Sequence, residues 1–424
     1  MNRIRVAHVS AWCGGGALAM VRIHQGLLDA GIHSRIHSVE KPDESIRDAY
    51  VIPRIRKPRL QRFAEKLLPS KALNKPDHWP SKIKYARRAN AACEVFSPPF
   101  EISRHDLSRV FCDIDVLHLH WVGGFFDFKD VFSSLDVPVV WTMHDQNPYF
   151  GGFHYQGDLD AATALLPIEY RLREIKAAAL EKVTLAVAGN SAWNTRLAMT
   201  TGVLPPGTVA ETVYLPLPIE DYVAIEKRVS KSSLGIDADT FVIGFASAAL
   251  ENRRKGFGDL VEAIGLLPES LRRRSTLLSF GRQPDPEIRQ SLDIAWKHLG
   301  YQSPGEQQSQ AYSAMDAFVI ASLEEAFGQT LLEALACQTA VIGTEVGGIP
   351  ETVQDGKTGL LVPKRSPHRI AMALQRMHAH PEFRTACGWA GRQLALDRHD
   401  PAKIARQYQS LYERLIARSR SAAA

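Results

Sequence analysis

Cysteine is scarce in this chain of 424 residues. The five cysteines are Cys13, Cys93, Cys112, Cys337 and Cys387. Their number is odd, they are scattered, and no C-x-x-C or other metal-ligand spacing occurs among them. This usage excludes a disulfide-stapled scaffold and favours reduced thiols in a cytoplasm.

Long apolar runs are also lacking. No stretch approaches the roughly 20 apolar residues of a membrane-spanning helix. The opening residues MNRIRVAHVSAW enter a strand pattern without a signal peptide. The net charge of +5 is mild and does not by itself indicate nucleic acid. We therefore expect a cytoplasmic protein that has no nucleic-acid partner.

The length exceeds what one hydrophobic core usually organises, so we expect two domains of roughly 200 residues each. Apolar residues make up 45% and charged residues 23%, as in ordinary globular proteins. The Pro-rich run VYLPLPI at 213–219 precedes a charged segment and gives the best boundary. The predicted parts are an N-terminal domain at 1–219, a C-terminal domain at 220–395, and a last helix with a disordered tail at 396–424.

The N-terminal domain opens with a strand at Ile4–Ser10, the loop WCGGGA, and a helix at Leu18–Ala30. Strand, glycine loop and helix begin a doubly wound α/β domain, whose ligand lies at the carboxyl ends of the strands. Gly15 and Gly16 would let the backbone approach a ligand closely. The loop is not G-x-G-x-x-G, so dinucleotide binding is disfavoured, and a plain tight turn is the alternative.

Two later strands carry polar residues at their carboxyl ends. VLHLHW ends at His120 and Trp121, and VPVVWT is followed by His144 and Asp145. Because the ends of adjacent parallel strands meet at one edge, these side chains could line the same cleft. Taken singly, a histidine at a strand end is more often structural.

The C-terminal domain restarts with a buried strand, FVIGFAS, followed by a loop with Arg253, Arg254 and Lys255 that opens an amphipathic helix. Cations at such a turn, beside free backbone N–H groups, would bind a diphosphate and offset charge on a leaving group. A solvated basic run is the alternative. Gly281 follows the next strand.

The most informative stretch is Ala321–Thr358. A helix from about Gly328 to Cys337 contains Glu333 as its only charge, so it is buried, and this carboxylate needs a partner. The side chain leans back toward the helix N-terminus, the end nearest Glu325. The same end presents free N–H groups that suit a phosphate. Two carboxylates beside an anion site indicate a pocket for a polyhydroxylated phosphate ester.

Glu325, the seven residues AFGQTLL, and Glu333 resemble the E-x7-E element of the retaining glycosyltransferases of family 4. The following EVGGIPETVQDGKTGLLV is similar to the next segment of that family. The resemblance implies the GT-B fold, two Rossmann-like domains that face a central cleft. It also implies a nucleoside-diphosphate sugar as co-substrate, no cofactor and no metal.

The resemblance also implies roles. Glu325 would hold hydroxyls of the donor sugar, and Glu333 the ribose hydroxyls. Arg254 and Lys255 would stabilise the diphosphate, although many relatives place the arginine where this chain has Leu250. The other donor-side residues are Gly15, Gly16, Gly281, Phe327, Gly328, Gln329 and Thr330.

The stretch HLHW...WTMHDQNPYFGGFHY resembles a bacterial branch associated with exopolysaccharide and colanic acid synthesis. In that branch the histidine matching His144 lies beside the transferred sugar. His120, Trp121, Asp145 and the turn at 151–155, with Tyr155, are then candidates for the acceptor side. The implied activity is retaining transfer of a sugar to a hydroxyl of a glycan or lipid-linked acceptor.

Residues 53–90 form a basic insertion with twelve lysines and arginines against Glu65 and Asp77. Such a segment can lie on an anionic membrane, which would place the protein peripherally on the inner face of the plasma membrane. A solvated insertion is the alternative.

Other functions stay open. An epimerase or a phosphorylase can share the architecture, and a sugar-nucleotide-binding protein could lack transfer. The D-x-D letters of Asp113 and Asp115 occur in metal-dependent transferases, but they enter a buried strand, so we interpret them as a strand cap.

Overall fold

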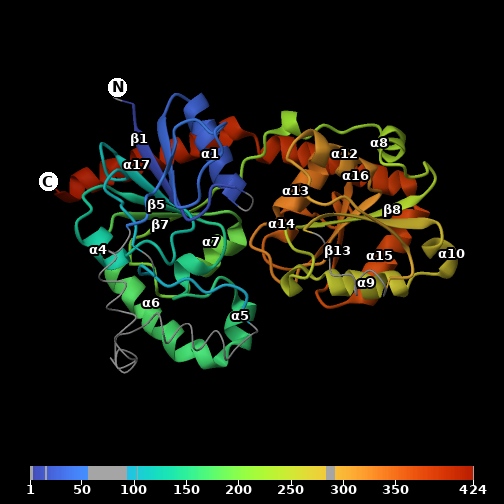
Figure 1. The fold of residues 1–424 in the computed structure, drawn as a ribbon, viewed down its shortest axis with the longest axis horizontal. Helices are drawn as coiled ribbons and strands as arrows, with labels where there is room; N and C mark the ends of the chain where they lie inside the picture. Colours follow the sequence, from blue (N-terminus) through green and yellow to red (C-terminus); the bar gives the residue numbers. More distant parts are fainter. Residues whose placement is uncertain (1–2, 15–16, 56–92, 103, 283–291, 424) are drawn as a thin grey trace. The chain divides into compact units, whose positions relative to one another are not determined.

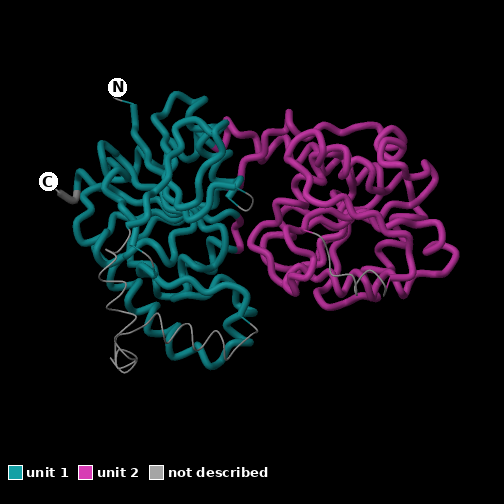
Figure 2. The backbone as a smooth tube through the Cα atoms, in the orientation of Figure 1, with its two compact units in different colours: residues 1–190, 194–213, 405–424 teal, residues 191–193, 214–404 magenta. Residues whose placement is uncertain are grey.

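The computed structural model describes residues 3–14, 17–55, 93–102, 104–282 and 292–423. The chain divides into two compact units (Figure 2). Unit 1 comprises residues 1–190, 194–213 and 405–424, and unit 2 comprises residues 191–193 and 214–404. The main change of unit falls at 213/214, where the sequence analysis placed it at 219/220. Residues 56–90 of the predicted basic insertion at 53–90 lie outside the described residues.

Unit 1 contains a seven-stranded parallel sheet in the order β3-β2-β1-β4-β5-β6-β7 (Figure 1). Its strands are β1 (Arg5–Ser10), β2 (His33–Ser38), β3 (Ala49–Val51), β4 (Val116–Leu119), β5 (Val139–Met143), β6 (Leu185–Gly189) and β7 (Val209–Thr212). The strand order reverses between β1 and β4, where a doubly wound sheet binds its ligand.

Helices surround this sheet, and its buried strands pack against large aromatic side chains such as Phe126, Phe128 and Trp141. The helices are α1 (Leu18–Asp29), α4 (Phe128–Ser133), α5 (Gln156–Ala161), α6 (Leu166–Leu180), α7 (Ala192–Ala198) and α17 (Pro401–Ala423). The chain's last helix reaches Ala423, so the predicted disorder of the tail is wrong. Alanine and arginine are strong helix formers, which favours this extension.

Residues 405–424, the larger part of α17, belong to unit 1. Tyr412 Oη lies 2.7 Å from Nδ1 of His118, and Tyr408 Oη lies 2.7 Å from Oγ1 of Thr142. The C-terminal helix is therefore hydrogen-bonded to the centre of the sheet. At the start of β4, Asp115 accepts hydrogen bonds from the backbone N and Nε of Arg5, at 2.9 and 3.0 Å. This is the strand-cap arrangement expected of the D-x-D letters.

Unit 2 contains a six-stranded parallel sheet in the order β10-β9-β8-β11-β12-β13. Its strands are β8 (Phe241–Ser247), β9 (Ser275–Gly281), β10 (Ala295–His298), β11 (Ala317–Ile320), β12 (Ala340–Thr344) and β13 (Gly359–Val362). Every residue of β8, β11 and β12 is buried, as expected for a parallel sheet covered on both faces.

The helices of unit 2 are α8 (Lys227–Ser233), α9 (Phe257–Gly265), α10 (Glu269–Arg272), α12 (Glu306–Ala314), α13 (Gln329–Ala336), α14 (Ile349–Thr352), α15 (Pro367–Ala379) and α16 (Pro381–Arg398). Both units are thus doubly wound α/β domains, which confirms the predicted fold class. In the part of the chain that the structure describes, no helix is long and apolar enough to cross a bilayer.

Candidate functional site

A charged cluster in unit 2 lies where the chain leaves β8 and β11. After β8 the chain forms the short 3-10 helix Arg253–Lys255, and Gly256 then takes a left-handed conformation with φ of 69°. A Cβ atom on Gly256 would lie 1.9 Å from the carbonyl oxygen of Ala321 at the end of β11. A glycine is therefore required here, and it brings Lys255 against the loop that carries Glu325.

Glu325 is the centre of this cluster. Lys255 Nζ lies 2.5 Å from its Oε2, and Arg254 Nη1 lies 3.7 Å from the same oxygen. Arg254 Nη1 also donates to the carbonyl oxygen of Glu324 at 3.0 Å, and Ser322 Oγ donates to Oε2 of Glu325 at 3.3 Å. The structure thus brings together three residues that the sequence analysis assigned to one site.

The electrostatics of the cluster follow from its burial. The Glu325 side chain is only 10% exposed, and burial alone would raise the pKa of its carboxyl group. The charges of Lys255 and Arg254 outweigh that penalty and hold the pKa of Glu325 below its usual value. The site therefore keeps a carboxylate and two cations together in a largely dry environment.

Glycines fix the loop around this carboxylate. A Cβ atom on Gly347 would lie 1.7 Å from the carbonyl oxygen of Glu325, and the amide of Gly348 donates to that oxygen at 3.1 Å. Gly328 precedes α13 with φ of 93°. Gly281 ends β9 with φ of 131°, and its Cβ position lies 1.8 Å from the carbonyl oxygen of Ser247. These glycines let strand-end loops of the sheet approach each other closely.

The N-terminus of α13 follows directly. Phe327 is buried, with its ring 5.5 Å from that of His399, whereas Gln329 and Thr330 are half-buried. The first amides of an α-helix have no partner within the helix and carry its positive dipole end. These amides can donate hydrogen bonds to an anion that binds beside Lys255.

Glu333 is buried in α13, and its carboxylate has the partners that its position required. Tyr222 donates to Oε1 and Tyr312 to Oε2, each at 3.1 Å. Burial and the charge of Glu333 raise the pKa of Tyr312 well above its usual value, so the tyrosine stays a donor. A carboxylate offers about four lone-pair sites, so a ligand hydroxyl would share this group with two tyrosines.

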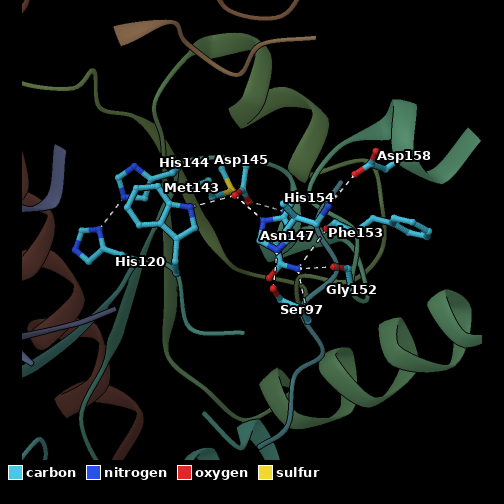
Figure 3. Close-up of polar contacts among 12 residues, drawn as sticks. Ser97, His120, Met143, His144, Asp145, Asn147, Gly152, Phe153, His154 and Asp158 are labelled. Carbon is cyan, nitrogen blue, oxygen red and sulfur yellow. Dashed lines mark hydrogen bonds and ion pairs between the residues drawn. The ribbon is translucent and has the colours of Figure 1, made fainter. Parts of the chain in front are cut away.

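A pocket in unit 1 lies beyond the ends of β4 and β5 (Figure 3). It has a volume of about 40 Å³, room for about three water-sized groups. Its lining residues are Ala11, Trp12, Ser97, His120, Trp121, Gly123, His144, Asp145, Asn147, Pro148 and His154.

Within this pocket, His144 is held from two sides. Its ring stacks on that of Trp121, with centroids 3.9 Å apart and planes at 18°. Its Nε2 lies 2.8 Å from Nδ1 of His120. Burial lowers the pKa of His144 to about 3, so the ring is neutral near pH 7.

Asp145 is held by three donors. Its Oδ2 accepts from Nε1 of Trp121 at 3.1 Å and lies 2.8 Å from Nδ1 of His154, while Oδ1 accepts from the amide of Asn147 at 2.9 Å. Burial would raise the pKa of Asp145, but His154 and the Asn147 amide lower it below its usual value. Asp145 thus orients the pocket walls, and its expected direct contact with an acceptor stays a prediction.

The sequence analysis named the turn at 151–155 as an acceptor-side candidate, and His154 in this turn lines the pocket. His154 links Asp145 to Ser97, because its Nε2 lies 3.0 Å from Ser97 Oγ. The neighbouring Tyr155 precedes α5 and is not among the described residues that line this pocket, so its acceptor-side role stays a prediction. Trp12 belongs to the WCGGGA loop that the sequence analysis noted, whereas Ser97 comes from a segment that no local pattern marked.

The glycine loop after β1 is partly described. The amides of Cys13 and Gly14 donate to Oε2 of Glu40, at 2.8 and 3.2 Å. Gly15 and Gly16 lie outside the described residues, so their donor-side role stays a prediction.

Helix α6 holds the turn that forms one wall of the pocket. The buried carboxylate of Glu169 accepts from the amides of Gly151 and Gly152 at 2.7 Å each, and from Arg173 Nε at 2.7 Å. The buried Lys176 donates to the carbonyl oxygens of Asn147 and Phe150. This charged support was not visible in the sequence pattern.

His8, His118 and His120 could be suspected of holding a metal, because their ring nitrogens lie within 4.8 Å of one another. However, both nitrogens of His118 have partners at 2.7 Å, Tyr412 and Thr142. The rings of His118 and His120 are also stacked at 26°, so their in-plane lone pairs run nearly parallel. Hydrogen bonding, and not convergence on one ion, accounts for this cluster.

The family described as Glycosyl transferases group 1 matches residues 240–380. This range lies within unit 2 and spans about a third of the chain. The matched range includes Arg254, Lys255, Glu325 and Glu333.

Curated relatives are also similar to this chain. The alpha-maltose-1-phosphate synthase of Mycolicibacterium smegmatis is 30% identical over 202 residues, covering 44% of this chain and 51% of the relative. The chain thus spans about half the length of the curated relatives it matches first.

Among solved structures, the sucrose-phosphate synthase of Thermosynechococcus elongatus has a TM-score of 0.69 at 20% identity, covering 98% of this chain and 100% of that one. The Anabaena protein HepE, solved with UDP and glucose, has a TM-score of 0.64 at 16% identity, over 97% and 100%. At these identities the likeness shows the fold, and it confirms the GT-B class.

Proposed function

We propose that this protein is a retaining glycosyltransferase that moves a sugar from a nucleoside-diphosphate sugar to a hydroxyl group of an acceptor. The observation that carries the proposal is the cluster of Glu325, Lys255 and Arg254 beside the N-terminus of α13, inside the range that the group 1 family matches. HepE was solved with UDP-glucose, which supports a nucleotide sugar as donor.

In this proposal the two cations serve the leaving group. Departure of the nucleoside diphosphate places negative charge on its phosphate in the transition state. Lys255, Arg254 and the amides of α13 would stabilise that charge, so they affect turnover more than binding of the intact donor. Glu325 would accept hydrogen bonds from the donor sugar, and Glu333 from the ribose.

His144 and the pocket of unit 1 would serve the reacting sugars. Trp121 and His120 fix the ring of His144, and Asp145 fixes the indole of Trp121. Retention is inferred from the E-x7-E resemblance, with a same-face attack in which the departing phosphate takes the acceptor's proton.

A thermal-shift panel tests the donor proposal. A ligand that binds only the native state raises the melting temperature according to its concentration and affinity. We expect one nucleoside-diphosphate sugar to raise it more than the free sugar does. No shift with any nucleotide sugar would contradict the proposal.

The alternative is a nucleotide-sugar-binding protein or epimerase without transfer. Slow hydrolysis of the bound donor distinguishes the two, because an active transferase releases the nucleoside diphosphate even without its acceptor. Binding without any release would favour the alternative.

We further propose a glycan or lipid-linked acceptor in cell-surface or exopolysaccharide synthesis. This part rests on the HLHW and WTMHD resemblance and on the basic insertion. Flotation with anionic liposomes tests the membrane contact. Equal flotation after neutralising Arg59, Arg62 and Lys66 would contradict it.

A further inference from the structure

Three histidines form a continuous hydrogen-bonded chain from the interior of unit 1 to its pocket. His8 lies in β1, His120 follows β4, and His144 follows β5. Nδ1 of His8 lies 2.9 Å from Nε2 of His120, and Nδ1 of His120 lies 2.8 Å from Nε2 of His144. The last link of this chain is visible in Figure 3.

All three rings are neutral near pH 7, because burial lowers the pKa of each. A neutral imidazole has one N–H donor and one bare nitrogen that accepts. Each link needs one donor and one acceptor, so choosing the proton position on any ring sets the other two. The chain therefore has only two hydrogen-bonded states, and they run in opposite directions.

The inner end of the chain selects between them. Nε2 of His8 is buried and has no hydrogen-bond partner among the described residues. Buried N–H groups without a partner are rarer in proteins than buried acceptors without one. Nε2 of His8 is therefore the bare nitrogen, and its Nδ1–H donates to Nε2 of His120. His120 then donates from Nδ1 to Nε2 of His144, which leaves the proton of His144 on Nδ1.

We propose that His8 and His120 are positioning residues that fix the tautomer of His144, so that it presents an Nδ1–H donor to the pocket. Nδ1 of His144 has no hydrogen-bond partner among the described residues, and the residue lines the pocket. The group it would meet is an oxygen that accepts a hydrogen bond, such as a sugar hydroxyl. Only this ligand's identity rests on the proposed function.

A second hydrogen-bonded chain, from Asp145 through His154 to Ser97, gives the pocket an acceptor in addition to the donor of His144. The carboxylate of Asp145 can only accept, so His154 donates to it from Nδ1. Ser97 Oγ lies 3.0 Å from Nε2 of His154, and the Ser97 hydroxyl lines the pocket with lone pairs that can accept a hydrogen bond. A donor from His144 and an acceptor from Ser97 suit a hydroxyl group, which both accepts and donates.

This polarity has a chemical consequence. With the proton on Nδ1, His144 has no bare nitrogen facing the pocket, so it cannot remove a proton from an acceptor hydroxyl. It orients a substrate oxygen and is not a general base.

The ligand-free protein tests the tautomer directly. Nitrogen–hydrogen correlation spectra of protein labelled in its 15 histidines distinguish a protonated from a bare ring nitrogen. The signal of His144 is identified by its absence in His144→Gln. We expect its proton on Nδ1, and a proton on Nε2 would overturn the proposal. Because no substrate is present, this outcome is separate from success or failure of the glycosyl-transfer assay.

A reversing variant tests the role of His120. The thioether in His120→Met can only accept, so His144 should move its proton to Nε2, and transfer should fall about tenfold for loss of one positioned hydrogen bond. The matched control is His118→Met, because the His118 ring stacks on His120 at 4.4 Å but bonds outside the chain. In that variant His144 should keep its proton on Nδ1. An unchanged tautomer in His120→Met would overturn the role of His120.

Discussion

The two units place opposite kinds of chemistry at the ends of their parallel strands. In unit 2 a carboxylate and two cations share one buried cluster, whereas in unit 1 the pocket is bordered by histidine rings that burial keeps neutral. Fixed charges suit a diphosphate, whose charge changes during reaction. Neutral donors and acceptors of set polarity suit hydroxyl groups. On the proposed function, unit 2 would hold the diphosphate of the donor and unit 1 would hold hydroxyl groups.

Lowering the pH should produce the largest difference in stability between the two units. Folding lowers the pKa of His8, His118, His120 and His144, the last to about 3. Below about pH 6.5 the unfolded chain binds protons that the folded unit does not. The free energy of unfolding therefore decreases as the pH is lowered, by up to roughly 1.4 kcal/mol per pH unit for each ring. Hydrogen exchange should show unit 1 opening at a higher pH than unit 2.

Among the described residues, unit 2 has fewer histidines whose pKa is lowered by folding. One of them is His399, whose pKa is lowered to about 4. Equal loss of protection in both units between about pH 7 and pH 5 would contradict this difference.

Removing the charged support of the unit 1 pocket should have the next largest effect. Glu169→Gln replaces a buried carboxylate that accepts hydrogen bonds from two backbone amides and from an arginine. We therefore expect a loss of about 3 kcal/mol in unfolding free energy. Denaturant unfolding measures it. The control on the same helix is Glu174→Gln, since Glu174 is exposed and pairs with Arg171. Its loss should stay below about 1 kcal/mol, and equal losses would argue against the pocket-support role.

A smaller effect should follow from Arg254→Lys in the unit 2 cluster. The charge remains, but the guanidinium Nη1 that donates to the Glu324 carbonyl and lies 3.7 Å from the Glu325 carboxylate is lost. We expect turnover to fall about tenfold, equivalent to roughly 1.4 kcal/mol. Arg273→Lys is the control, because Arg273 is exposed and pairs with Glu269. Full turnover in Arg254→Lys would contradict the role of Arg254 at the leaving group.

The unit 2 cluster could be predicted because each of its two parts carries a local sequence signal, although Lys255 and Glu325 are 70 residues apart. Arg254 and Lys255 adjoin a glycine at a strand-to-helix turn, and Glu325 and Glu333 are separated by one apolar helix start. The parallel sheets were predictable as well, since strands buried on both faces give continuous apolar runs. Glu333 was predicted to need a partner, but the tyrosines that supply it come from other elements.

The unit 1 pocket was only half predictable. His120, Trp121, His144 and Asp145 follow recognisable strands, but His8 reads as one residue within a strand. Its role depends on the register that places β1 beside β4, where His8 lies opposite His118. Contacts set by sheet register leave no local sequence signal.

The most direct test of the proposed function is glycosyl transfer by Lys255→Ala, with Lys364→Ala as the exposed control in the same unit. Lys255 holds Glu325 and faces the proposed diphosphate, so its loss should lower turnover by about two orders of magnitude, the effect typical of a lost charge-stabilising donor. The control should keep its rate. Unchanged turnover in Lys255→Ala, with wild-type transfer measured in the same assay, would contradict the assignment.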